Sequence, residues 1–501
     1  MLQRGLCLYA ASRSGGSGGA VASPAVRRPA ILALLLSLLA AVLLPGCGGA
    51  KDTGRTVRIG VDATYPPFES VQDGQFTGFD VELGRALAEE MGGRAEFVNT
   101  SFDGVFPALL GGKFDLVMSA VTITDERRAR LAFSEPYYTA GQVVAVREGE
   151  QQVKSIDDLD GKTAGIQINT TASLVLQKHP AVTVRQYPTI DLALQDLANG
   201  NLAAVVGDAP TLRYFIAHGF GRLSTVGALL TEEHYGIAMD PRRTDLHKEV
   251  NAALARLRAN GKFAALEEKY FGKAAAAEAA QAQGAAQLPW ARMARTLLRG
   301  LVLTVALTLL SLVLGLPLGL ALALARLSRR GWIRAVASSY VELFRGTPLL
   351  VQIIFVYYAL PQLVGLDLAP FAAAVLALTL NCAAYVAEIF RAGIGAVDAG
   401  QLEAAQALGL SRWQGMRHVV LPQAFRHALP PLTNEAIALL KDSSLVSIIG
   451  MAELTRSGQE LASQLAAPLA VWPAVALFYL LVTFPLTRLA GGLERRLRIQ
   501  H

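Results

Sequence analysis

The sequence predicts a two-lobed α/β domain followed by an all-helical membrane domain of five spans. Three observations support this expectation. Residues 55–273 alternate between short buried strands and amphipathic helices, which is typical of a mostly parallel sheet covered by helices. Residues 290–501 contain long uncharged stretches of the kind that cross membranes. The charge is also divided, because residues 55–289 carry 23 Lys/Arg against 29 Asp/Glu, whereas residues 290–501 carry 18 against 10.

The first 54 residues are expected to form an export leader. Arg27 and Arg28 precede Ala30–Leu44, which has no charge, and Cys47 follows shortly afterwards. A positive segment, an apolar core and small residues are the parts of a secretory signal, and this core is shorter than the roughly 20 residues of a spanning helix. The Cys after a small residue resembles a lipoprotein signal, in which Cys47 is acylated. Plain cleavage and an uncleaved anchor remain alternatives.

The α/β domain, residues 55–273, is expected to contain two lobes joined by extended crossovers. Ligands bind such folds in the crevice at the carboxyl ends of the strands. The domain contains none of the three cysteines, and the seven histidines are scattered, so neither a disulfide nor a metal site is expected there. The predicted strands are 57–61, 95–98, 114–118, 163–166 and 203–206, and the predicted helices are 79–91, 102–110 and 192–197.

Polar side chains follow several of these strands. Ser119, Thr122 and Arg127 lie after the third strand, where hydroxyls, free backbone N–H groups and a guanidinium suit a carboxylate. Asp208 ends a later strand and suits an ammonium, although alone it would more often cap the helix that begins at Ala209. Taken singly, Arg127 would more often form a surface ion pair.

Together with Tyr65 and Phe102, these residues resemble the periplasmic binding proteins for polar amino acids. The matching stretches are 62–69, 78–81, 122–127, 169–171, 207–208 and 261–271. The resemblance implies a type II binding-protein fold in which Arg127, Thr122 and Thr171 hold the ligand carboxylate, and Asp208 and Ser119 hold the ammonium. It implies that Tyr65 and Phe102 enclose the ligand side chain and that Asp62 meets its polar end. Ala120, also expected at the ligand site, and Asn169 depart from the common pattern, so the preferred amino acid among Gln, His, Arg and Lys stays open.

After a tether over 274–289, residues 290–501 are expected to form the membrane domain. Trp290–Arg299 suits an interfacial helix or a solvated leader to the first span. The five candidate spans are 301–325, 349–364, 369–389, 437–454 and 471–489. Arg residues gather in the first and third loops and in the tail, which places these in the cytoplasm and the α/β domain outside.

The third loop reads as a short helix, a turn at Gly409 and a second short helix stopped by Pro. Its residues Glu403, Ala404, Ala405, Gly409, Leu421 and Pro422 resemble the coupling loop of ATP-binding-cassette importer permeases of type I. The resemblance implies a partner ATPase dimer that binds ATP and Mg²⁺, a second permease subunit (the same chain or a paralogue) and a place in the bacterial cytoplasmic membrane. Asn381 and Glu388 are candidate translocation-pathway residues, because polar groups inside spans are functional candidates; interhelical pairing is the alternative.

Several function classes are excluded or disfavoured. The nearest approach to a phosphate-binding loop, Gly161-Lys162-Thr163, lacks the glycine five residues before Gly161, so this chain is expected to hydrolyse no ATP and to bear no catalytic residue. The positive charge is not gathered on a soluble module, which argues against nucleic acid as a partner. Two rival functions remain: an enzyme that resembles cyclohexadienyl dehydratase on the same two-lobed fold, and a ligand-gated channel.

Overall fold

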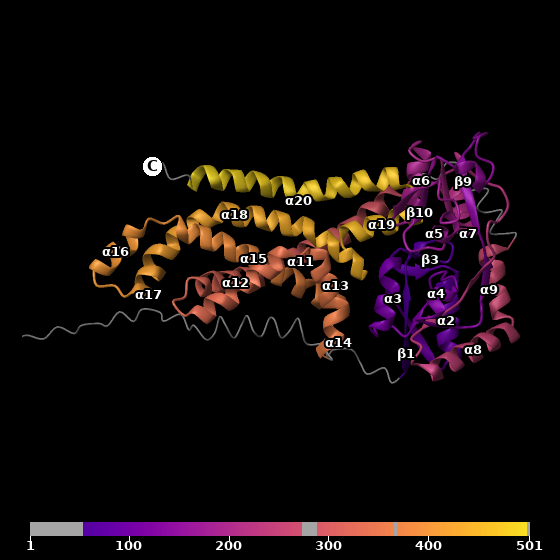
Figure 1. The fold of residues 1–501 in the computed structure, drawn as a ribbon, viewed down its shortest axis with the longest axis horizontal. Helices are drawn as coiled ribbons and strands as arrows, with labels where there is room; N and C mark the ends of the chain where they lie inside the picture. The colour runs from indigo at the N-terminus through magenta and orange to yellow at the C-terminus, as the bar shows by residue number, and fades with distance from the viewer. Residues whose placement is uncertain (1–53, 273–287, 365–367, 498–501) are drawn as a thin grey trace, which may run out of the picture. The chain divides into compact units, whose positions relative to one another are not determined.

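The computed structural model describes residues 54–272, 288–364 and 368–497, which belong to a single unit of the chain. An α/β region, 55–271, precedes a helical region, 290–497 (Figure 1). The predicted leader with Cys47 and most of the predicted tether lie outside the described residues.

The first lobe is built on a five-stranded mixed sheet in the order β5-β1-β6-β15-β7. β1 is parallel to β5 and β6, and β15 is antiparallel to β6 and β7. β1 buries Val57, Ile59 and Val61 completely or nearly so, because it lies between β5 and β6 in a sheet that helices cover. The elements of this lobe are β1 (Arg55–Val61), β2 (Thr64–Tyr65), β3 (Glu69–Gln72), β4 (Gln75–Thr77), α2 (Phe79–Glu90), β5 (Gly93–Asn99), α3 (Phe102–Leu110), β6 (Leu116–Val117), α4 (Asp125–Arg128), β7 (Ala132–Phe133), β15 (Ala238–Met239), α8 (Thr244–Ala259) and α9 (Lys262–Phe271).

The second lobe has a five-stranded sheet in the order β11-β10-β12-β9-β13, with β9 antiparallel to β12 and β13. Two segments connect the lobes, and they pair with each other as the short antiparallel strands β8 (Tyr138–Ala140) and β14 (Glu233–Tyr235). The chain therefore crosses between the lobes on adjacent paths. The remaining elements are β9 (Gln142–Arg147), η1 (Ile156–Leu159), β10 (Thr163–Gln167), α5 (Ala172–Leu176), β11 (Thr183–Tyr187), α6 (Ile190–Ala198), β12 (Ala204–Asp208), α7 (Ala209–His218) and β13 (Leu223–Val226).

The helical region contains α11 (Trp290–Arg326), α15 (Pro370–Gly395) and α20 (Pro468–Leu497), which are the three described helices long and apolar enough to cross a membrane. A fourth candidate is a pair, Gly331–Gly346 and Leu349–Ala359, bent by 107°. α11 and α15 approach closely at Gly319, where an added Cβ would lie 2.5 Å from Val386 Cγ1. The other elements are α12 (Gly331–Gly346), α13 (Leu349–Ile354), the π-helical turn η2 (Phe355–Ala359), α14 (Leu360–Val364), α16 (Ala399–Ala407), α17 (Arg412–Gly415), the π-helical turn η3 (Met416–Val420), α18 (Leu421–Asp442), the 3₁₀ helix η4 (Ser443–Ile449) and α19 (Leu454–Leu465).

The start of the helical region differs from the prediction. Trp290–Arg299 is not a separate helix, because α11 continues unbroken from Trp290 to Arg326. Arg292 on this first stretch meets the α/β region, since its Nε lies 2.6 Å from Asp73 Oδ1. An acidic neighbour on the α/β region thus accounts for a basic residue at this end of the helix.

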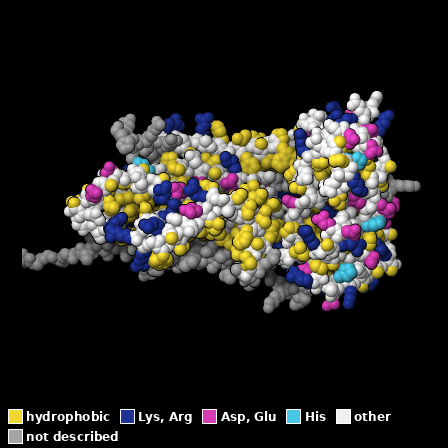
Figure 2. Space-filling model, viewed as in Figure 1, with side chains coloured by type: hydrophobic (Ala, Val, Ile, Leu, Met, Phe, Trp, Pro, Cys, Tyr) yellow, Lys and Arg dark blue, Asp and Glu magenta, His cyan; other side chains and the backbone are white. Residues whose placement is uncertain are grey.

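Two predicted spans have a different local structure. The stretch 349–364 is α13, η2 and α14 in succession rather than one regular helix. The stretch 437–454 is also interrupted, because α18 ends at Asp442, a 3₁₀ helix follows, and Gly450 adopts a left-handed conformation with φ of 76°. Figure 2 shows hydrophobic side chains over the middle of the helical region and Lys and Arg side chains near its α16–α17 end.

Candidate functional site

A cavity lies within the α/β region. Its lining contains all nine residues that the sequence predicted for ligand binding, together with Gln167 and Thr170, which the prediction missed. The nine are Asp62, Tyr65, Phe102, Ser119, Ala120, Thr122, Arg127, Thr171 and Asp208. Residues from both lobes therefore converge on one cavity.

Arg127 is fixed at one side of the cavity. It lies in α4, whose N-cap Thr124 accepts a hydrogen bond from the Arg127 backbone N–H at 3.2 Å. Its Nη1 donates to the Thr122 carbonyl oxygen at 2.8 Å and its Nη2 to the Asn169 carbonyl oxygen at 2.9 Å. These bonds use two of the five guanidinium N–H donors, so the group can still donate to an anion in the cavity.

Aromatic rings hold the same guanidinium. Arg127 Cζ lies 5.6 Å from the centre of the Phe102 ring and 5.2 Å from that of Phe106. Burial lowers the pKa of Arg127 from its ordinary value, against the opposing effect of Asp208 and Glu233. A guanidinium keeps its charge in proteins, so the cavity has a permanent positive charge at this side.

Backbone conformation accounts for one of the two departures from the common sequence pattern. Asn169 has φ of 61° and Ala120 has φ of 47°, both in the left-handed region. Glycine and asparagine adopt this conformation most readily. Asn169 therefore adopts its left-handed conformation readily, whereas Ala120 is more strained in the same conformation.

Asp208, at the end of β12, provides a negative charge to the cavity. Its carboxylate accepts a hydrogen bond from the Tyr65 hydroxyl at 2.8 Å and others from the Tyr235 hydroxyl and Gln142 Nε2. Burial, with the nearby charge of Glu233, raises the pKa of Asp208 to about 6. The alternative that this side chain caps α7 is wrong, because it makes no capping hydrogen bond.

Glu233 is a second buried acid that the sequence reading missed. Its Oε2 accepts hydrogen bonds from the hydroxyls of Thr122 and Thr171, each at 2.7 Å. These hydroxyls therefore donate to Glu233 in this structure. Glu233 lies in the short strand β14 of a crossover, where no hydrophobic pattern draws attention to it; the Thr-Glu-Glu run at 231–233 was the available signal.

Asp62 and Ser119 line the same cavity and are hydrogen-bonded to each other. Asp62 accepts hydrogen bonds from the Phe102 backbone N–H at 3.1 Å and the Thr64 hydroxyl at 2.9 Å. The Ser119 hydroxyl accepts from the Asp62 backbone N–H at 3.1 Å and donates to Glu69 at 2.6 Å. Burial raises the pKa of Asp62, and Arg456 of helix α19 opposes that rise.

The predicted coupling loop forms α16, a turn and α17. Gly409 has φ of 85°, and Ser411 caps α17. Next to the turn, Leu408 and Trp413 are 85% and 54% exposed, so the loop presents apolar side chains at its surface. Glu403 and Ala404 are exposed on α16, whereas Ala405 is buried.

The second half of this loop differs from the prediction. Leu421 and Pro422 do not stop a short helix; they begin the 22-residue helix α18, with Pro422 in its first turn. A proline is tolerated there because the N–H groups of a first turn need no partner within the helix. The π-helical turn η3 connects α17 to α18.

The two candidate pathway residues both have partners on neighbouring helices. Asn381 is buried, and its Nδ2 donates to Gln352 Oε1 at 3.0 Å. Glu388 pairs with Arg326 at 2.7 Å, with Arg345 at 3.8 Å and with Arg391. The structure therefore shows interhelical pairing for both. Within the described ranges, no group of three or more His, Cys, Asp or Glu is placed to hold a metal ion.

Comparisons with known proteins divide the chain in the same way. Residues 57–273 match the model of bacterial extracellular solute-binding proteins, family 3, and residues 315–499 match that of the binding-protein-dependent transport system inner membrane component. The glutamine transport system permease protein GlnP of Escherichia coli K12 is 47% identical over 171 residues, 34% of this chain and 78% of that protein.

The α/β region has relatives of its own. The L-arginine-binding protein of Pseudomonas aeruginosa is 39% identical over 252 residues, which cover 48% of this chain and 96% of that protein. Among solved structures, a mutant of ArgBP from T. maritima is 35% identical, with a TM-score of 0.42 over 47% of this chain and 100% of that one.

Proposed function

This chain belongs both to the family 3 extracellular solute-binding proteins and to the inner membrane components of binding-protein-dependent transport systems, and we propose that its cavity holds a polar α-amino acid by both charged groups. The chain is the binding and permease component of a polar amino acid ABC importer and is not itself an enzyme. Similar proteins are named for glutamine and for arginine transport. The proposed boundaries are a leader over 1–54, a binding domain over 55–273, a tether over 274–289 and a permease domain over 290–501.

One observation carries the proposal for the ligand: Arg127 and Asp208, of opposite charge, line the same cavity. An α-amino acid carries a carboxylate and an ammonium on one carbon, so it can satisfy both residues at once. In the proposed pose the carboxylate meets Arg127 and the backbone near Thr122 and Thr171, and the ammonium meets Asp208 and the Ser119 hydroxyl oxygen. Tyr65 and Phe102 enclose the ligand side chain, and Asp62 meets its polar end.

For the permease domain we propose five crossings. The three candidate spans and the bent pair give up to four, and α18, with Pro430 and Pro431 inside it, is proposed as another. Loop charge supports a cytoplasmic position for the α16–α17 loop and the C-terminal end, and an outer position for the binding domain. A secretory leader that is lipidated at Cys47 fits this orientation.

The exposed Leu408 and Trp413 on the α16–α17 loop support a docking role for this loop. We propose that it inserts into a groove of a separate ATPase dimer, which binds ATP and Mg²⁺. Five crossings form half of a pathway, so a second permease subunit, either this chain again or a paralogue, completes the transporter. Two copies of this chain would bring two tethered binding domains to one pore.

The test is a thermal-shift screen of the full chain, in detergent, against each of the twenty standard amino acids. A ligand that binds only the folded protein stabilises it by about 2.7 kcal/mol at one hundred times its dissociation constant. We expect stabilisation by glutamine, arginine, lysine or histidine and none by leucine or aspartate. A screen in which no amino acid raises the unfolding temperature would refute the proposal.

A further inference from the structure

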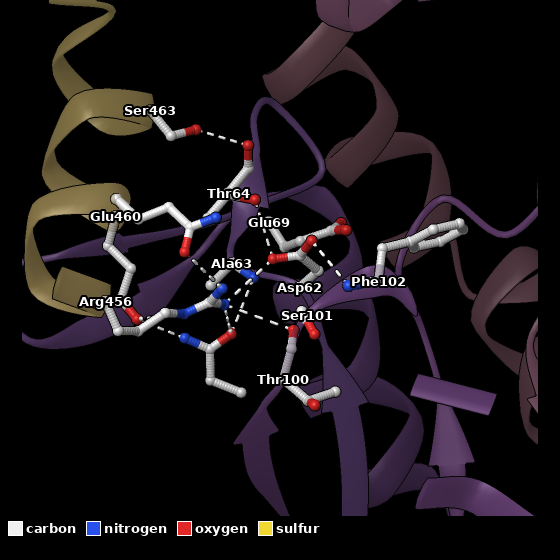
Figure 3. Close-up of polar contacts among 12 residues, drawn as sticks. Asp62, Ala63, Thr64, Glu69, Thr100, Ser101, Phe102, Arg456, Glu460 and Ser463 are labelled. Carbon is white, nitrogen blue, oxygen red and sulfur yellow. Dashed lines mark hydrogen bonds and ion pairs between the residues drawn. The ribbon is translucent and has the colours of Figure 1, made fainter. Parts of the chain in front are cut away.

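Helix α19 of the permease domain reaches the binding domain through one buried arginine. Arg456 is 1% exposed, although it lies on an amphipathic helix between two membrane segments. Its Nη2 lies 3.1 Å from Asp62 Oδ1 (Figure 3). The same nitrogen donates to Asn99 Oδ1 at 2.6 Å. Its Nε lies 3.3 Å from Glu460 Oε1 on the same helix. The guanidinium is therefore held between an acid of its own domain and an acid of the binding domain.

The position of Arg456 is fixed by its surroundings. Glu453 is the N-cap of α19 and accepts a hydrogen bond from the Arg456 backbone N–H at 2.7 Å. One turn beyond Glu460, the Ser463 hydroxyl donates to the Thr64 carbonyl oxygen at 2.5 Å. Asn99 Nδ2 donates to Glu460 at 2.5 Å and so closes the network. These bonds tie α19 to Thr64, two residues after Asp62, and to Asn99 at the end of β5.

Asp62 belongs both to this interface and to the lining of the ligand cavity. It lines the cavity, and its Oδ2 accepts the Phe102 backbone N–H inside the binding domain. Its other oxygen, Oδ1, faces Arg456 (Figure 3). Asp62 is 2% exposed, so water screens neither its charge nor that of Arg456 well.

This arrangement affects amino acids of different charge differently. A cationic side chain at the polar end of the cavity would use the Asp62 carboxylate as its counter-ion. With the binding domain docked, Arg456 already pairs with that carboxylate, and the two cations would repel each other across it. A neutral amide needs only hydrogen bonds there and meets no like charge.

We propose that Arg456 is a specificity-determining residue supplied by the permease domain, which weakens the binding of arginine and lysine relative to glutamine while the binding domain is docked. The inference rests on the proposed function. By linkage, a cationic ligand weakens docking by the same factor by which docking weakens its binding. Glu460 keeps a partner for Arg456 in either case, so the guanidinium need not become unpaired when a cation takes Asp62.

The experiment measures the dissociation constants of L-arginine and L-glutamine for the full chain in nanodiscs. For Arg456→Gln we expect the ratio of the arginine constant to the glutamine constant to fall at least about tenfold, since a buried like charge has been removed. Arg456→Lys keeps the charge and should stay near the wild-type ratio. Ser463→Ala is the matched control, because it removes an uncharged contact of the same helix with the binding domain.

An unchanged ratio in Arg456→Gln, or an equal shift in Ser463→Ala, would overturn the inference. In the Arg456→Gln chain the Asp62 carboxylate is free to pair with a cationic ligand, so adding Asp62→Asn should raise the ratio again. A ratio that Asp62→Asn leaves unchanged would contradict the shared-carboxylate explanation. Failure of the wild-type chain to bind either amino acid would refute the proposed function and, with it, this inference. Binding of both with a ratio insensitive to Arg456 would refute this inference alone.

Discussion

The binding geometry predicts that replacement of Arg127 will strongly weaken amino acid binding. The guanidinium already donates to two backbone carbonyls and lies beside the Phe102 and Phe106 rings, so it is oriented before a ligand arrives. A carboxylate that accepts two of its remaining N–H groups forms two charge-assisted bonds. At about 1.5 to 3 kcal/mol each, their loss in Arg127→Ala should raise the dissociation constant ~10² to 10⁴-fold.

The assay is calorimetric titration of the full chain in nanodiscs with arginine and with agmatine, which is arginine without its carboxylate. Arg127→Ala should weaken arginine binding strongly and agmatine binding little, because only arginine presents the group that Arg127 holds. Arg128→Ala is the matched control; the neighbouring side chain is exposed, and the change should alter affinity by about twofold at most. Equal losses for arginine and agmatine, or unchanged arginine affinity, would refute the carboxylate role.

Three further results are expected. The pKa of Asp208 is raised to about 6, so its carboxylate is ionised above that pH. In a pH titration of binding, amino acid affinity should therefore weaken about tenfold per pH unit below 6. An affinity that stays constant from pH 8 to 5 would contradict the role of Asp208. Gly450→Ala places a Cβ 1.6 Å from the Asn99 carbonyl oxygen, so uptake should fall while ligand affinity persists. Gly261→Ala is the control: its φ is 78°, nothing lies within 4 Å of the added Cβ, and uptake should stay intact. Equal losses of uptake in the two variants would argue against a docking effect. Gly409→Val adds about 1 to 2 kcal/mol of left-handed strain and should separate ATP hydrolysis from uptake, whereas Gly409→Asn should retain coupling; normal uptake by Gly409→Val would count against the coupling loop.

Much of the α/β region could be predicted because its signals are local. Every strand and helix predicted between residues 57 and 206 overlaps an observed element of the same type. Strand β12, for example, is buried along its whole length and reads as an apolar run that ends in Asp208. A polar residue directly after such a run lies at the ligand edge of a sheet, which is why Asp208 and Ser119 could be placed.

Other features depend on contacts distant in sequence. Glu233 reaches the cavity only because the return crossover pairs with the outgoing one, and no periodic pattern marks that pairing. Arg456 could not be identified from the sequence for the same reason. In the sequence it is one arginine in a loop, and its role follows from a contact with Asp62, 394 residues away. The bend between α12 and α13 and the interruption after Asp442 likewise arise at short polar or Pro-containing stretches that hydropathy alone does not resolve.

Import is tested most directly by uptake of radiolabelled glutamine and arginine into proteoliposomes that contain this chain and its ATPase. With ATP supplied on the side of the α16–α17 loop, we expect the amino acid to accumulate against its gradient, and Arg127→Ala should abolish that accumulation. Equilibration without ATP would indicate a channel instead. Absence of uptake by a transporter that still hydrolyses ATP and binds amino acid would contradict the assignment of this chain as the importing subunit.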